Sequence, residues 1–125
     1  MNGLAVVLGL LGFGWLTLFQ LLLSAGAPIG RLAWGGVHRV LPKGLRVASL
    51  ASALLTFLAV MVVLQAGRFV SILPEPWITP LLWAFAVFFA ASFLLNLLGA
   101  KGWERLHGVP LTLICTGSCA ILALS

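Results

Sequence analysis

The segment WITPLLWAFAVFFAASFLLNLL, residues 77–98, contains no Asp, Glu, Lys or Arg and is rich in Leu, Phe and Ala. This run exceeds the ~20 apolar residues that a helix needs to cross a bilayer. Backbone polar groups in hydrocarbon must bond within the segment, so the segment is expected to be a helix. Similar runs cover about residues 3–25, 47–66 and 107–124. The sequence therefore predicts four membrane-spanning helices in a single domain, residues 1–125.

The overall composition supports a membrane location. Hydrophobic residues make up 62% of the chain and charged residues 7%, and the mean hydropathy is +1.22. Soluble domains carry about 25% charged residues. The formal net charge of +5 does not suggest nucleic acid, because there is no polar folded surface on which a basic patch could lie. We interpret the charge as a topology signal and as an attraction for anionic lipid headgroups.

Most of the positive charge lies in one connection, GAPIGRLAWGGVHRVLPKGLR, residues 26–46, which holds four of the seven Lys and Arg. The third connection adds Lys101 and Arg105, which gives four plus two, or six, against Arg68 alone in the second connection. Basic connections stay in the cytoplasm, so both termini are predicted outside it. We expect an all-α integral membrane four-helix bundle, running up-down-up-down, with a long basic connection between its first two helices.

The basic connection is the main candidate site. Its apolar residues fall at helical spacing, which predicts an amphipathic segment in the headgroup plane, bent at Gly35 and Gly36. Together with the start of the fourth span, it is expected to form a platform for anionic phospholipid or for a partner membrane subunit, including a second copy of the chain. The positive-inside rule alone also explains such charges. The candidate residues are Arg31, Trp34, His38, Arg39, Lys43, Arg46, Glu104 and Arg105.

Two other functions stay open at this point. An oligomeric transporter or channel would need a polar cavity that includes Gln20, Gln65 and Asn96, the amides in or near spans. A membrane enzyme acting on a lipid-like substrate would need His38, His107 and Glu104 to meet at one pocket. We favour a binding or accessory component, because only two acidic residues exist in the chain and no Asp, Glu, Lys or Arg falls in the middle of a span.

Small residues within the spans are expected to pack helices together. Gly9, Gly12 and Gly14 allow close approach in the first span. Cys115 and Cys119 lie four apart on one helix face, and we interpret them as buried packing residues. No catalytic residue, cofactor or metal ligand is assigned.

A set of glycine, proline, tryptophan and charged positions forms a recognisable pattern: Gly26-Ala27-Pro28, Gly30, Ala33-Trp34-Gly35-Gly36, Leu41-Pro42, Leu45-Arg46, Ser49, Asn96, Glu104-Arg105 and Pro110. This pattern resembles that of a family of small uncharacterised bacterial inner-membrane proteins with four helices. The resemblance covers most of the chain and implies a location in the bacterial plasma membrane and four spans. The family carries no established activity, so no catalytic role is implied.

Overall fold

A computed structural model describes residues 2–33, 38–99 and 102–125, and this part of the chain contains helices and no strand. All four long helices have the length and apolar character needed to cross a membrane, counting η3 together with α3. The prediction of an all-α, multi-pass membrane protein is confirmed at this level. The elements are α1 (Asn2–Ser24), η1 (Gly30–Leu32), α2 (Lys43–Ala66), η3 (Glu75–Trp77), α3 (Ile78–Leu98) and α4 (Gly102–Leu124).

α2 begins earlier than the apolar run indicated. It starts at Lys43 instead of near Val47, directly after Pro42, whose extended backbone precedes the first turn. Proline suits the start of a helix, because the first N–H groups have no acceptor within the helix and the N–H that proline lacks is therefore not missed. Lys43 and Arg46 therefore belong to the first turn of α2, and the connection that precedes the helix is shorter than residues 26–46.

α4 also begins earlier, at Gly102 instead of near His107. Glu104 then lies in its first turn, where the positive end of the helix dipole favours a carboxylate. Because the helix starts this early, Pro110 lies inside it. Its ring removes one intrahelical hydrogen bond.

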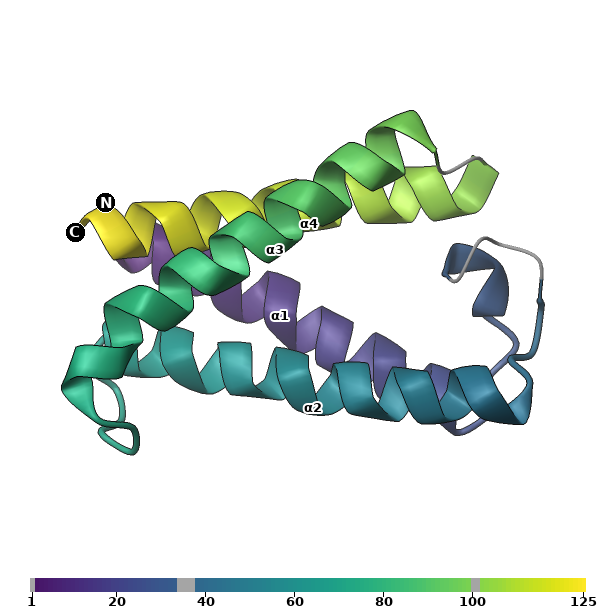
Figure 1. Cartoon of the computed structure of the whole chain (residues 1–125), viewed down its shortest axis with the longest axis horizontal. Coiled ribbons are helices and arrows are strands. Elements are labelled where there is room, and N and C mark those ends of the chain that lie inside the picture. Colours follow the sequence, from purple (N-terminus) through teal and green to yellow (C-terminus); the bar gives the residue numbers. More distant parts are fainter. Residues whose placement is uncertain (1, 34–37, 100–101) are drawn as a thin grey trace.

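The four helices have two distinct ends, which Figure 1 shows. Both chain termini and the α2–α3 connection lie at one end, which we call the terminus end. The α1–α2 and α3–α4 connections lie at the other, which we call the basic end. α1 packs along α2, α3 packs along α4, and α1 also contacts α4, whereas α2 and α3 touch over a short length only.

Two separate apolar clusters reflect this arrangement. The larger occupies the terminus end and takes side chains from all four helices, among them Phe13, Val63, Phe85 and Cys115. The ring of Phe13 meets that of Phe85 edge-on, with centroids 5.9 Å apart, and that of Phe89 at 5.2 Å. The smaller cluster lies at the basic end and contains no buried residue of α3 or α4. The four-helix core is therefore complete at one end only.

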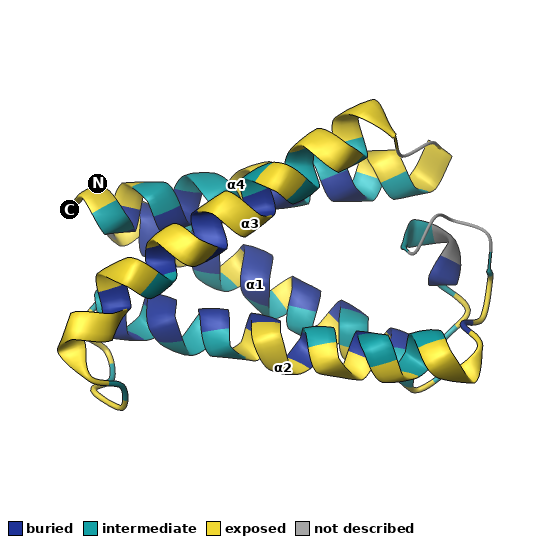
Figure 2. Ribbon diagram, in the orientation of Figure 1, coloured by how far each residue is buried: buried dark blue, intermediate teal, exposed yellow. Residues whose placement is uncertain are grey.

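The outward faces of the helices remain apolar. Figure 2 shows exposed positions along the outside of every long helix. Among them are Leu11, Leu54, Val87 and Leu113, each more than half exposed. An apolar surface of this extent suits contact with lipid and not with water.

The glycines of α1 divide into two kinds. A Cβ on Gly9 would lie 3.2 Å from Val63, and one on Gly12 would lie 3.0 Å from the sulfur of Cys115. Both glycines therefore permit close helix packing, as predicted. Gly14 has no neighbour within 4 Å among the described residues, so the prediction was wrong for this position.

Candidate functional site

The connection from α1 to α2 folds back against the ends of these two helices. Leu41 is almost completely buried and packs with Phe19 and Leu23 of α1. Ile29 and Leu32 from the first half of the connection pack on this cluster. The apolar residues of the stretch thus bury against the protein, where we had expected an apolar edge facing the lipid. Among the described residues of the connection, only Gly30–Leu32 form a helical turn. The predicted bend at Gly35 and Gly36 lies outside the described part of the chain.

Close backbone approaches hold this fold. The N–H of Gly30 donates to the carbonyl of Arg39 at 2.8 Å, and a side chain at Gly30 would collide with the backbone of His38 and Arg39. Gly26 has a φ of +93°, and the guanidinium of Arg46 lies over it. Arg46 Nε also donates to the carbonyl of Leu41 at 2.9 Å. Arg46 is thus partly a structural residue that ties α2 to the connection.

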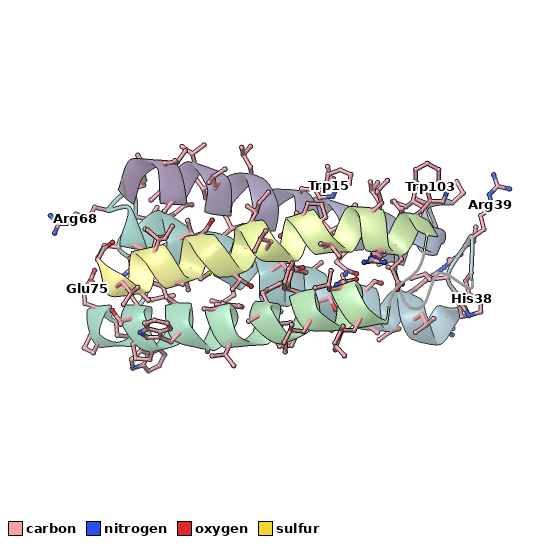
Figure 3. The ribbon with its side chains drawn as sticks, turned by 90° about the horizontal axis from the view of Figure 1, so that it is seen from above. Trp15, His38, Arg39, Arg68, Glu75 and Trp103 are labelled. Atoms are coloured by element: carbon pink, nitrogen blue, oxygen red, sulfur yellow. The ribbon has the colours of Figure 1, made fainter. Side chains whose placement is uncertain are left out.

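The structure places the other predicted basic residues at the same end. Arg39 and Lys43 are exposed, and His38 is half-buried. Figure 3 shows Arg39, His38 and Trp103 at one end of the bundle and Arg68 and Glu75 at the other. Nothing is described for Trp34 or for the side chain of Arg31, which lie outside the described part of the structure.

Glu104 and Arg105, adjacent in sequence, turn to different sides of α4. Glu104 is half-buried, engages in a polar interaction and lines a pocket inside the helix bundle. Arg105 is exposed and borders a shallow groove with Leu106 and Pro110. η1 of the connection contacts α4.

The pocket lined by Glu104 has a volume of about 480 Å³ and lies between the two helix pairs. All four long helices contribute to it, and Leu32 and Ala33 of the connection border it at the basic end. Its volume falls within the range of small-molecule sites, ~300–1,000 Å³. No local sequence pattern predicts this pocket, because its residues come from distant parts of the chain.

Polar groups in the pocket differ in how they are satisfied. The hydroxyls of Thr56, Ser92 and Thr112 donate to carbonyls of their own helices, as does Nδ2 of Asn96. Gln20 differs, because its Oε1 is buried and has no hydrogen-bond partner in the described part of the chain. An unsatisfied buried acceptor of this kind costs ~1–3 kcal/mol.

His107 lines the same pocket and is held by aromatic residues of α1. The indole Nε1 of Trp15 donates to Nε2 of His107 at 2.8 Å, and the ring of Phe19 lies 4.5 Å from the imidazole, centroid to centroid. Because an indole N–H can only donate, Nε2 must carry a lone pair, so this imidazole is neutral with its proton on Nδ1. The role of Trp15 is to orient His107.

The three amides singled out in the sequence do not share one cavity. Gln20 and Asn96 line the pocket, but Gln65 is buried at the terminus end. Gln65 Nε2 donates to the carbonyl of Leu73 at 2.7 Å, and Gln65 Oε1 accepts from the N–H groups of Ile72 and Leu73 at 3.1 and 2.8 Å. Gln65 therefore holds the α2–α3 connection in place. A cavity built from all three amides, which the transporter hypothesis needs, is not formed.

The convergence that the enzyme hypothesis needs is also incomplete. His107 and Glu104 line the pocket, whereas His38 does not. Cys115 and Cys119 are free and fully buried, with Cys115 against Gly12. The described residues contain no group of three or more His, Cys, Asp or Glu with the geometry of a metal site. Chemically, the arrangement offers hydrogen bonding beside an apolar cavity, with Arg39 and Lys43 exposed at the same end of the bundle.

Comparison with protein-family models, with curated proteins and with solved structures finds no match for this chain. What the site does must therefore be argued from its geometry.

Proposed function

We propose that the chain is a bacterial inner-membrane protein that acts as a binding or accessory component and binds anionic lipid at its basic end. In this proposal the four helices form an up-down-up-down bundle. The α1–α2 and α3–α4 connections face the cytoplasm, and both termini lie outside. Six Lys and Arg lie in or beside the two cytoplasmic connections against Arg68 alone in the other, which the positive-inside rule favours.

The observation that carries the proposal is the exposure of two cations at the basic end, Arg39 on the folded connection and Lys43 in the first turn of α2. The carbonyl of Arg39 accepts from Gly30, and Leu41 between the two cations is buried and bonded by Arg46. A basic residue near an anionic membrane surface contributes ~1 kcal/mol to lipid attraction. Two exposed cations at one end of the bundle therefore contribute about 2 kcal/mol toward anionic headgroups.

The test is retention of anionic lipid by the purified protein in native mass spectrometry. The variant is Arg39→Gln with Lys43→Gln, both exposed, whereas Arg46 is left intact because it supports the fold. Loss of about 2 kcal/mol from two cations corresponds to about 30-fold weaker retention. The matched control is Arg68→Gln, an exposed cation at the terminus end. Equal retention by the double variant and by this control would overturn the proposal.

A further inference from the structure

We infer that the pocket between the helix pairs holds an acyl chain and the adjoining polar link of a lipid from the leaflet at the basic end. The inference rests on the proposed function, since the charged headgroup of the same lipid would lie on Arg39 and Lys43. It adds a second site, inside the bundle, and names the part of the lipid that the site takes.

The length of the pocket fits one leaflet. Along α3 it extends from Gly99 at the basic end to Phe88. Eleven residues at 1.5 Å per residue span roughly 16 Å. The hydrocarbon core of a bilayer is about 30 Å thick, so one leaflet accounts for about 15 Å. A chain that enters at the basic end would end near the Phe13–Phe89 ring contact that closes the core.

The polarity of the lining changes along this length as it does along a lipid. The polar residues Glu104, His107, Asn96 and Gln20 stand near the basic end, beside the apolar Phe19, Leu32 and Ala33. Deeper positions are Leu16, Phe88, Phe89 and Leu111, together with hydroxyls that are already bonded to their own helices.

The polar side chains of the lining suit the link between headgroup and chain. Gln20 and Asn96 line this part of the pocket. Nε2 of His107 accepts from the indole of Trp15, which makes Nδ1 the ring's donor. Ester carbonyls are acceptors and a glycerol hydroxyl is both donor and acceptor, so this region of a lipid can pair with amide and imidazole groups.

A lipid can reach the pocket from the side. α2 and α3 touch over a short length only, and the pocket is bordered there by Leu55 of α2 and by Phe88 and Leu95 of α3. These three side chains are 42%, 53% and 73% exposed, so the wall of the pocket continues into the lipid-facing surface. The opening between α2 and α3 therefore faces the hydrocarbon that supplies the chain.

The test uses an anionic phospholipid with a photoreactive diazirine in its acyl chain, incorporated with the full-length protein into vesicles. After irradiation, peptide mass spectrometry maps the labelled residues. We expect labelling of pocket residues such as Phe89 and Leu111. Ser92→Trp fills the pocket from α3 and should abolish this labelling. The matched control, Ala91→Trp, places the same side chain on the adjacent exposed position and should leave the labelling unchanged.

Ser52→Trp fills the pocket from α2 and keeps the test decisive if Ser92→Trp does not fold. Labels spread evenly over the lipid-facing surface, or pocket labelling that survives both Trp variants, would overturn the inference. The proposed function fails separately, when Arg39→Gln with Lys43→Gln leaves anionic lipid retention unchanged. If the cation variant loses lipid and the labels avoid the pocket, the headgroup site stands and the chain site is refuted.

Discussion

Replacing Gln65 by Leu should destabilise the protein far more than a typical membrane hydrogen bond would suggest. Gln65 is 4% exposed and makes four hydrogen bonds, to Leu73 twice, to Ile72 and to Glu75. Each is worth ~0.5–1.5 kcal/mol net, and Leu leaves two backbone N–H groups without their acceptor. The expected loss in the free energy of unfolding is about 2–4 kcal/mol.

Gln20→Leu is the matched control in the same chain. Its Oε1 is buried and unpartnered in the described part of the structure, so removing it also removes a desolvation cost. We expect the free energy of unfolding to stay within ~0.5 kcal/mol of wild type or to rise.

Reversible unfolding in mixed micelles of dodecyl maltoside and SDS, followed by circular dichroism, measures both variants. Inter-helix hydrogen bonds in membrane proteins average about 0.6 kcal/mol. A loss for Gln65→Leu no larger than this value would refute the view that Gln65 fixes the α2–α3 connection. Equal losses in the free energy of unfolding for Gln65→Leu and Gln20→Leu would refute the same view.

Three further predictions concern packing, the histidine and the membrane orientation. Gly12→Leu should lower the free energy of unfolding by ~1–3 kcal/mol, because the new side chain overpacks against Cys115. Gly14→Leu has open space around its Cβ and should be close to neutral in the same assay. Equal effects of the two variants would contradict the packing. Trp15→Phe removes the donor to His107, so ¹⁵N NMR of labelled histidine should show one fixed Nδ1–H tautomer in wild type and a mixture in the variant; an unchanged spectrum would contradict the Trp15–His107 bond. Membrane orientation is tested in a background in which Cys115 and Cys119 are replaced by Ala. Lys43→Cys should react with an impermeant maleimide only from the cytoplasmic side, and Arg68→Cys only from outside. The reverse pattern would overturn the orientation.

The four helices could be predicted from the sequence because length and apolar composition are local properties. The starts of α2 and α4 could not be predicted in this way. A run of apolar residues shows where contact with lipid begins, and the helix extends beyond that point. Lys43 and Glu104 illustrate this, because charged residues in a first turn lie at headgroup depth and still have helical backbone. Boundaries at the basic end were therefore placed too far into the spans.

The site was predicted in part only. Charge in the connection is visible in the sequence, and the structure gathers its described members at one end. The pocket is not visible, because it arises from an angle between helix pairs that no local pattern encodes. Trp15 and His107 are 92 residues apart, and their bond depends on that angle. A polar residue deep in a span, such as Gln20, was the available signal, but the sequence did not tell whether a neighbour satisfied it.

The size of the pocket argues that something fills it in the membrane. A sealed, empty cavity costs about 24 cal/mol per Å³, so 480 Å³ would cost roughly 12 kcal/mol. That is as large as the whole stability of a typical domain, ~5–15 kcal/mol. The opening between α2 and α3 removes this cost, because hydrocarbon can enter where side chains do not meet. The acyl chain that we propose for the pocket would complete the core at the basic end.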